Sequence, residues 1–468
     1  MKFAIIHAII SADSQLQTPN SKLISMFQVR SYMLDISRDR VPTMATLRLI
    51  VDLLARYRYN QLQLYMEHTY AYSNHEDVWE EADPLNAREI AKLQAYCEIQ
   101  GIELVPCQNT FGHMERWLTL PRYNPLAKFP KGGAMTPWGT VKKFPTTLDP
   151  AKPGSIALVQ EILDELLPQF SSPLANICCD ETFEISDIEE YLGFFEKVCA
   201  IARANGKRPM FWGDIVLKHP ECVKRLPKDL IALDWGYEAN HPFMKEAAKF
   251  AACGLEFYVC PGTSAWRSLA GRIENMRDNL AAAEEAGRRF GAKGYMLTDW
   301  GDEGHWQPLA ASLPAIVLAG NFAASGPKAA KMDVERELDS IMDAPLGGLL
   351  MRLGTLYLRG GALKANCSEL FNILRNPHGY SRHPGLTQAV LDDISGVASG
   401  VRQAAQRWAD HDNPWAKEIV YMANLIDCAC HRRDEGRLRA LRDEHGRIWR
   451  MRSREGGRID SLAKLPRF

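Results

Sequence analysis

Two adjacent acids, Asp180 and Glu181, end a short apolar run and are the residues most suggestive of chemistry. The run, residues 176–179, is β-prone and therefore indicates a buried strand that carries these carboxylates at its C-terminal end. Catalytic groups gather at that end of the strands in parallel α/β barrels, so the pair suggests acid–base work. The alternative is a helix start, with Asp180 as the cap and Glu181 as a solvated first-turn acid.

The rest of the chain supplies elements that could position this pair. Short apolar runs alternate with helical patterns over roughly 300 residues, the size and rhythm of a (β/α)8 TIM barrel. A doubly wound open sheet is the alternative, but it usually has fewer strands. The expected strands are 32–36, 61–66, 102–107, 176–179, 209–212, 230–235, 256–260 and 294–298. The expected helices are 43–57, 87–100, 155–167, 187–204, 241–252, 274–290 and 309–324.

Three regions follow from this pattern: an N-terminal extension (1–29), the (β/α)8 barrel (30–330) and an all-α C-terminal domain (331–468). The last region is predicted because helical periodicity replaces strand-like runs after Lys331. The segment 108–152 is rich in proline and glycine, and loops of this length are usually lids or binding loops.

Composition excludes some classes of function. The formal net charge of the 468-residue chain is −1, so no global field attracts nucleic acid or an anionic membrane. The eleven cysteines include no CxxC pair with zinc-site spacing, and buried thiols in a reducing compartment explain them most simply. The apolar segment 1–10 has a single charge and no cleavage box, which argues against export. We therefore expect a cytoplasmic protein without a membrane-spanning segment.

Aromatic rings accompany the carboxylates at the predicted strand ends. Trp212, Trp235, Trp266 and Trp300 follow four of the eight strands. An indole face stacks on the apolar face of a pyranose, while carboxylates accept hydrogen bonds from its hydroxyls. Each tryptophan alone is ordinary core, but together they favour a sugar site. The other side chains expected at these ends are Asp35, Glu67, His68, His113, Glu115, Asp214, Asp234, Thr263, Ser264, Asp299, Asp302 and His305.

The same ends raise the alternative of a metal site formed by His113, Glu115, His305 and Asp180. Two-metal barrel hydrolases need converging histidines, commonly in closely spaced pairs. The sequence contains neither HxH nor HExxH. We therefore expect no catalytic metal and no cofactor.

Residues 176–181 resemble the Asp-Glu signature of glycoside hydrolase family 20, the β-N-acetylhexosaminidases. The chain is similar to this family at further positions, in the same order. The similar segments are 30–38 (the family's Arg-Gly-x-x-Leu-Asp-x-x-Arg), 60–65 (its second strand), 111–113 (Pro-Gly-His), 211–214 (its fifth strand) and 299–302 (Trp-Gly-Glu). The resemblance covers residues 30–318 and implies an exo-acting enzyme that removes terminal β-linked GlcNAc or GalNAc.

The resemblance also implies a mechanism. Adjacent side chains of a regular strand point to opposite faces, so Asp180 and Glu181 are poorly placed to flank one glycosidic bond. In family 20 the 2-acetamido oxygen of the substrate attacks the anomeric carbon instead, through an oxazolinium ion and with retention. By resemblance, Glu181 is the general acid and then the base, and Asp180 holds the acetamido N–H. Trp300 and ionised Asp180 would keep Glu181 protonated.

Further roles carry over from the family to matching positions. Arg30 is expected to hold the 3- and 4-hydroxyls, Asp302 the 4- or 6-hydroxyl, and His113 to tune the proton affinity of Glu181. The expected walls of the sugar site are Trp212, Trp235 and Trp300. The alternatives are a salt bridge at the barrel bottom for Arg30 and a helix cap for Asp302.

Some positions depart from the family pattern. Glu67 stands where an aspartate usually pairs with the histidine, and residues 261–266 lack the tyrosine that holds the acetamido oxygen in many members. Only about 29 residues precede the first strand, where members commonly carry an α+β domain. These differences indicate a compact branch with a C-terminal helical domain.

Two other functions stay open at this stage. One is a retaining glycosidase of other specificity, with Glu67 or Asp302 as the nucleophile opposite Glu181. The other is a non-catalytic sugar-binding barrel. The expected partner in either case is a small-molecule glycan or glycoconjugate, with neither nucleic acid nor membrane. The choice between GlcNAc and GalNAc stays open, as does the oligomeric state, a homodimer included.

Overall fold

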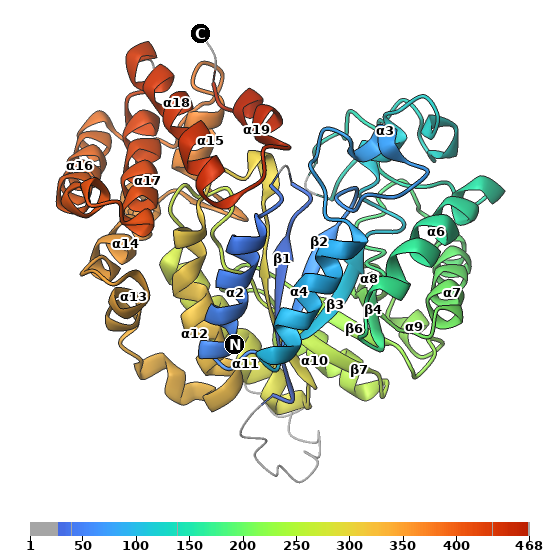
Figure 1. Cartoon of the computed structure of the whole chain (residues 1–468). Coiled ribbons are helices and arrows are strands. Elements are labelled where there is room, and N and C mark those ends of the chain that lie inside the picture. The colour runs from blue at the N-terminus through green and yellow to red at the C-terminus, as the bar shows by residue number, and fades with distance from the viewer. Residues whose placement is uncertain (1–26, 39, 138, 433, 467–468) are drawn as a thin grey trace, which may run out of the picture.

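A closed barrel of eight parallel strands, paired in chain order from β1 to β8, forms the centre of the molecule (Figure 1). The computed structural model describes residues 27–38, 40–137, 139–432 and 434–466. The barrel strands are β1 (Val29–Asp35), β2 (Gln61–Met66), β3 (Glu103–Gln108), β4 (Leu174–Asn176), β5 (Arg208–Trp212), β6 (Ile231–Trp235), β7 (Glu256–Cys260) and β8 (Gly294–Asp299). The predicted (β/α)8 fold is confirmed. Most of the predicted N-terminal extension, residues 1–26, lies outside the described residues.

Helices surround the barrel and pack on it through apolar side chains. In α2 (Met44–Arg56), Leu47, Ile50 and Leu54 are buried, and the Thr43 hydroxyl caps the helix by accepting from the Thr46 N–H. The other long helices of this layer are α4 (Ala87–Ile99), α6 (Pro153–Leu166), α7 (Ile188–Ala204), α10 (Phe243–Ala252), α11 (Ile273–Phe290) and α12 (Leu313–Ser325). Short helices in the loops are α3 (Glu76–Trp79), α5 (Glu115–Leu118), α8 (Asp214–Lys218) and α9 (Pro220–Val223).

The fourth strand differs from its prediction, since β4 ends at Asn176 instead of Cys179. The Asn176 side chain accepts a hydrogen bond from the Cys178 N–H and turns the chain. Cys178 and Cys179 then adopt φ angles of 59° and 65°, in the left-handed region. The alternation of a regular strand therefore does not apply to the acids that follow.

One stretch of the described residues, Leu309–Lys331, is long and apolar enough to cross a membrane, which the sequence prediction had excluded. It contains α12 (Leu313–Ser325), and 83% of its most apolar window is buried inside the protein. The stretch is therefore accounted for as a core helix that packs against the barrel.

The C-terminal region is helical, as predicted, and packs on one side of the barrel (Figure 1, orange to red). Glu418 joins the two parts: its fully buried carboxylate accepts from the Ala310 N–H at 2.7 Å and pairs with Arg452 at 2.6 Å. The helices are α13 (Val334–Met342), α14 (Gly347–Leu353), α15 (Glu369–Arg375), α16 (Gln388–Asp410), α17 (Pro414–Cys430), α18 (Glu435–Arg452) and α19 (Arg458–Lys464). A small hairpin joins β9 (Leu363–Lys364) to β10 (Cys367–Ser368).

Candidate active site

Asp180 and Glu181 lie beyond the carboxyl end of β4, on the irregular turn that begins at Asn176. Glu181 also has a left-handed backbone, with φ of 48°. The loop after β3 passes very close to this turn, because a Cβ atom on Gly112 would lie 2.3 Å from the Asp180 carbonyl oxygen. Glycine at position 112 therefore allows His113 to reach the two acids.

The His113 imidazole contacts both carboxylates with one nitrogen. Its Nε2 lies 3.4 Å from Asp180 Oδ2 and 3.3 Å from Glu181 Oε2. The second oxygen of Asp180 accepts from the Asn109 amide at 3.1 Å. The two acids thus meet at one point, and Glu181 is the more exposed, with 19% of its side chain accessible against 8% for Asp180.

The electrostatics of this cluster favour an ionised Asp180. Burial raises the pKa of Asp180, but the charge and hydrogen bond of His113 outweigh burial and leave that pKa below its ordinary value. The pKa of His113 changes in the complementary direction: burial lowers it, yet Asp180 and Glu181 raise it well above 6.5. The arrangement is therefore a buried ion pair with a second, more accessible carboxyl group beside it.

A further, partly buried acid, Asp214, lies next to Glu181 at the start of α8. Its Oδ2 is 3.4 Å from the Glu181 N–H and 3.7 Å from Lys218 Nζ. Burial, reinforced by the charge of Asp180, raises the pKa of Asp214 to about 7. The sequence placed this residue at a strand end but gave it no role.

Arg38, which follows β1, reaches the cluster from the opposite side. Its guanidinium lies 3.2 Å from Glu67 and 3.4 Å from Asp35, with Nη2 3.3 Å from His113 Nδ1. The same group lies over the rings of Tyr65 and Trp300, at 4.8 and 5.2 Å from their centroids. Arg38 is thus a positive group held between carboxylates and aromatic faces.

Glu67 is the carboxylate held by Arg38, so it is linked to His113 through that arginine. Its Oε1 accepts from the Tyr65 hydroxyl at 2.9 Å, and its N–H donates to Ser37 Oγ at 2.6 Å. Burial raises the pKa of Glu67 to about 7 although Arg38 and His113 lower it. No direct hydrogen bond between Glu67 and His113 is present among the described residues.

Aromatic rings line the same end of the barrel. The Trp212 and Trp300 rings lie 6.0 Å apart, and Trp300 meets Tyr65 edge-on at 4.8 Å. Trp235 stacks on Tyr237 at 5.2 Å, and the Tyr237 hydroxyl accepts the indole N–H of Trp300 at 2.8 Å. The indole N–H groups of Trp212 and Trp235 are buried and find no partner among the described residues. The structure therefore brings the predicted tryptophans together.

The comparison with known families decides the assignment. A sequence model of the glycosyl hydrolase family 20 catalytic domain matches residues 27–266, more than half of the chain. The chain belongs to glycosyl hydrolase family 20. The predicted resemblance is therefore confirmed, and the protein is a glycoside hydrolase of this family.

Two curated relatives of the family 20 chain carry the name hexosaminidase D. The protein of Bos taurus is 23% identical over 305 residues, which cover 56% of this chain and 85% of the relative. The protein of Homo sapiens is 24% identical over 324 residues, covering 62% of this chain and 64% of the relative. The match thus spans a little less than two thirds of the human protein.

Solved structures of family 20 enzymes share the fold at low sequence identity. The exo-β-N-acetylglucosaminidase of Vibrio harveyi in complex with N-acetylglucosamine has a TM-score of 0.52 and 16% identity, over 70% of this chain and 58% of that one. The N-acetyl-β-hexosaminidase of Streptomyces plicatus has a TM-score of 0.51 and 17% identity, over 70% and 69%. Both likenesses concern the barrel architecture.

Arg30 of this family 20 chain does not reach the site, which corrects the predicted contact with sugar hydroxyls. It lies near the N-terminal end of β1 and donates to the backbone carbonyls of Phe27 and Arg58. The spacing could have shown this. A strand advances about 3.3 Å per residue, so the first and last arginines of the segment 30–38 face opposite ends of the barrel. Arg38 is the arginine at the carboxyl end.

Tyr237 is the residue that sequence reasoning missed. Residues 261–266 after β7, where many family members carry a tyrosine, contain none, whereas Tyr237 comes from the loop after β6. The segment Trp235-Gly236-Tyr237, directly after a predicted strand, was the available signal. Its hydroxyl accepts a hydrogen bond from the Trp300 indole N–H, so the loop after β6 supplies a phenol at the aromatic wall.

The remaining predicted residues occupy different places. Asp302 follows β8 and comes near Arg38, whose pKa its charge helps to raise. Glu115 lies 3.7 Å from Lys142, and His305 lines a small cavity with Arg40 and Arg452. Of the groups postulated for a metal site, His113 and Asp180 meet, but Glu115 and His305 lie elsewhere. Among the described residues, another cluster, formed by Asp234, His241 and Glu246, brings three potential ligands together.

Proposed function

We propose that this family 20 enzyme is an exo-acting β-N-acetylhexosaminidase that works with retention and substrate assistance. The observation that carries the proposal is the contact of one His113 nitrogen with both Asp180 and Glu181. Two carboxyl groups that meet at one atom cannot stand on opposite sides of a glycosidic bond, as a carboxylate nucleophile and its acid partner must. The nucleophile is then the acetamido oxygen of the substrate.

Glu181 is the proton donor in this proposal. It is the more accessible acid of the pair, and the ionised Asp180 beside it disfavours a second negative charge. After the aglycone leaves, the same carboxylate takes a proton from the water that opens the oxazolinium ring. His113 holds both acids in position throughout.

Asp180 and Tyr237 hold the acetamido group. Asp180 is fixed by Asn109 and His113, so its ionised oxygen is oriented to accept the acetamido N–H and to stabilise the developing positive charge. The Tyr237 oxygen accepts from Trp300 and retains a proton that it can donate to the acetamido oxygen. Trp212, Trp235 and Trp300 supply the apolar walls.

Arg38 and Asp302 bind the sugar hydroxyls. The Arg38 guanidinium presents donors at the carboxyl end of the barrel, with Asp302 nearby as an acceptor. Glu67 is paired with Arg38 and has a raised pKa of about 7, both of which make it a poor nucleophile. These contacts speak against a glycosidase that uses Glu67.

We also propose a cytoplasmic location and a glycan or glycoconjugate substrate. All eleven cysteines are free thiols, and all but Cys253 are buried. Even Cys107 and Cys178, whose sulfur atoms are 3.7 Å apart, are not bonded. Such cysteine usage is typical of a reducing compartment.

The test compares an aryl β-N-acetylglucosaminide with the matching aryl β-glucoside. Turnover of the acetamido substrate alone, lost in Glu181→Gln, is the expected result. Equal turnover of the glucoside would show that the nucleophile is a protein group and not the acetamido oxygen. Sugar binding without turnover of either substrate would make the barrel a receptor.

A further inference from the structure

A second group of two carboxylates and one histidine lies outside the barrel wall, against α10. In β6, Leu233 faces the barrel interior, and the alternation of a strand turns Asp234 outward toward the helix layer. Asp234 has an exposure of 0%, and neither of its oxygens has a hydrogen-bond partner among the described residues. A buried carboxylate without a donor is costly, so this position calls for a positive charge or a proton.

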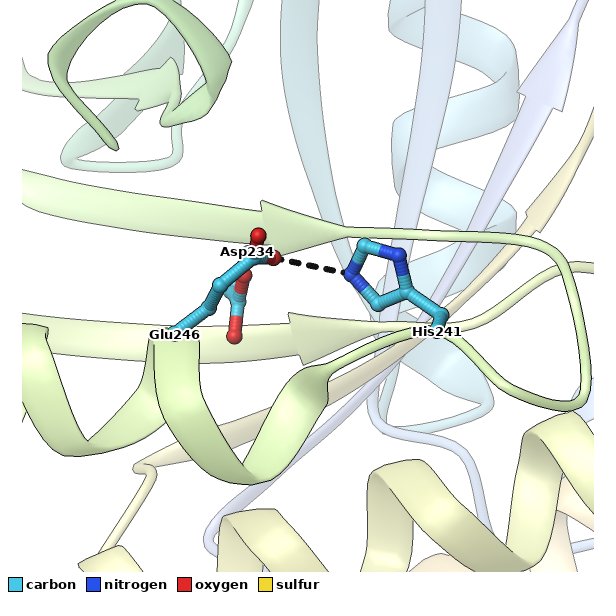
Figure 2. A group of neighbouring side chains, drawn as sticks. All are labelled: Asp234, His241 and Glu246. Carbon is cyan, nitrogen blue, oxygen red and sulfur yellow. Dashed lines mark ion pairs between the residues drawn. The ribbon is translucent and has the colours of Figure 1, made fainter. Parts of the chain in front are cut away.

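Two side chains converge on Asp234 from successive elements. His241 comes from the loop after β6 and Glu246 from the first turns of α10, as Figure 2 shows. One ligand atom from each of the three residues lies within 4.8 Å of the others. His241 Nε2 and Glu246 Oε2 are 2.9 Å apart. The three potential ligands therefore already point at a common centre.

Local packing holds the imidazole in this position. A Cβ atom on Gly236 would lie 2.1 Å from the His241 ring, so the ring occupies space that only glycine leaves open. Phe243 meets the ring edge-on with centroids 4.4 Å apart. The orientation of His241 toward the acids is thus built into the loop.

Charge compensation within the protein is incomplete at this cluster. Lys249, one turn further along α10, favours the ionised form of Asp234, but its amine is directed to the Leu217 carbonyl at 3.4 Å. Burial and the facing Glu246 together raise the pKa of Asp234 well above its ordinary value. A divalent cation would neutralise both carboxylates and leave the imidazole neutral.

We propose that Asp234, His241 and Glu246 bind one divalent transition-metal ion of the Zn²⁺ class. One imidazole nitrogen and two carboxylate oxygens suit Zn²⁺ and Co²⁺, whereas Mg²⁺ and Ca²⁺ prefer oxygen ligands alone. Ligands about 2.1 Å from a tetrahedral ion lie roughly 3.4 Å from one another. Small side-chain rotations reach this geometry from the observed one, and water completes the coordination.

The ion would act on the sugar site as a positioning element. It ties the end of β6 to α10 and fixes the loop that carries Tyr237, which stacks on Trp235 and holds Trp300. It touches neither Asp180 nor Glu181, so it takes no part in bond cleavage. Binding of the ion does not depend on the proposed glycosidase activity, and the two proposals can fail separately.

The experiment titrates the chelator-treated full chain with Zn²⁺ and with Co²⁺. We expect one equivalent to bind, a visible Co²⁺ absorption band, and a Tm increase of about 3 °C at a hundredfold excess over Kd. Asp234→Asn should weaken binding at least tenfold and reduce the Tm increase to about half or less at the same ion concentration. The matched control is Glu221→Gln, because Glu221 faces His219 at 3.6 Å without a third ligand in the described structure; it should bind as the unaltered protein does.

Two further variants test the site independently of Asp234→Asn. His241→Gln and Glu246→Gln change side chains that are 19% and 21% exposed, so both should fold and lose the ion. Stoichiometric binding that survives in all three variants would overturn the proposal. So would an unaltered protein that binds no ion, and Asp234 and Glu246 would then share a proton.

Discussion

The cluster at Asp180 and the cluster at Asp234 contain the same groups, two carboxylates and an imidazole, and behave in opposite ways. The pKa of Asp180 lies below its ordinary value, because His113 outweighs the effect of burial. The pKa of Asp234 lies well above, because burial and Glu246 act together. Both acids are buried, so the difference comes from donors: Asn109 and His113 serve Asp180, whereas Asp234 has none in the described structure.

This difference separates two uses of one set of residues. We call Asp180, Glu181 and His113 the inner cluster, and Asp234, His241 and Glu246 the outer cluster. In the inner cluster, neighbouring side chains compensate the charge of Asp180, and Glu181 stays partly exposed at the barrel mouth. In the outer cluster, the fully buried Asp234 lacks a compensating donor among the described residues, while His241 and Glu246 are 19% and 21% exposed, which favours an external cation. The number of hydrogen-bond donors around a carboxylate, more than its burial, thus distinguishes a proton-transfer site from an ion-binding one.

The largest effect is expected at the open acid of the inner cluster. Glu181→Gln should lower kcat on an aryl β-N-acetylglucosaminide by about 10²- to 10⁴-fold, because general-acid assistance is lost. Steady-state kinetics checks this, with Glu115→Gln as the control, since Glu115 faces Lys142 instead. If kcat of Glu181→Gln were unaltered, the cluster at Asp180 would not be a proton-transfer site, and the proposed difference from the cluster at Asp234 would be wrong.

Asp214 tests whether an acid poor in donors behaves like Asp234 even beside the inner cluster. Its folded pKa of about 7 exceeds the ordinary 3.8, so its neutral form stabilises the fold below pH 4 and that contribution is lost as pH rises to 7. In Asp214→Asn, the loss of unfolding free energy between pH 4 and pH 7 should be smaller by up to about 4 kcal/mol. Urea unfolding at pH 4 and pH 7 measures it; an equal change at both pH values would contradict the assignment.

Arg38 is the cation beside Glu67 and His113, whereas the Lys249 amine near Asp234 is directed to the Leu217 carbonyl. Arg38→Lys loses the planar group that contacts Glu67 and His113 and stacks on Tyr65, so kcat/KM should fall by roughly 10²-fold, mainly through KM. Arg30→Lys, at the other end of the barrel, should leave both constants unchanged. The reverse result would restore Arg30 to the sugar site.

Removal of the charge should change stability with opposite sign in the two clusters. Asp180→Asn loses charge-assisted hydrogen bonds and should destabilise the protein by about 2 kcal/mol at pH 7. Asp234→Asn relieves an uncompensated carboxylate and should stabilise the metal-free protein by about 1 kcal/mol. Thermal unfolding in the presence of chelator measures both, and shifts of the same sign would refute the comparison.

The smallest effect is expected at Tyr237, which lies on the loop between Asp234 and His241 and contacts Trp235 and Trp300. Tyr237→Phe removes one hydrogen bond to the acetamido group and should lower kcat/KM about tenfold. Tyr57→Phe, whose hydroxyl contacts Glu337 away from the site, is the control. Kinetics identical to those of the control would exclude Tyr237 from substrate binding.

The barrel could be predicted because short apolar runs alternate with helical patterns along the sequence, and the number of these runs is eight. It was harder to predict which end of a strand a residue occupies. Arg30 and Arg38 belong to the same motif, and because β1 ends at Asp35, Arg38 is the one that reaches the site. The end of β4 at Asn176 depends on a side-chain hydrogen bond that no periodicity reveals. The Asp234 cluster combines a strand, a loop and a helix, so its spacing matches no metal-binding motif.

The contact made by Glu418 makes the stability of the barrel depend on the helical region. Its carboxylate connects the segment after β8 to α18 across the boundary between barrel and helical region. Loss of the helical region would leave the Ala310 amide without its acceptor and uncover the core helix α12. The two parts of this chain therefore depend on each other for stability, and a substitution at the boundary affects both.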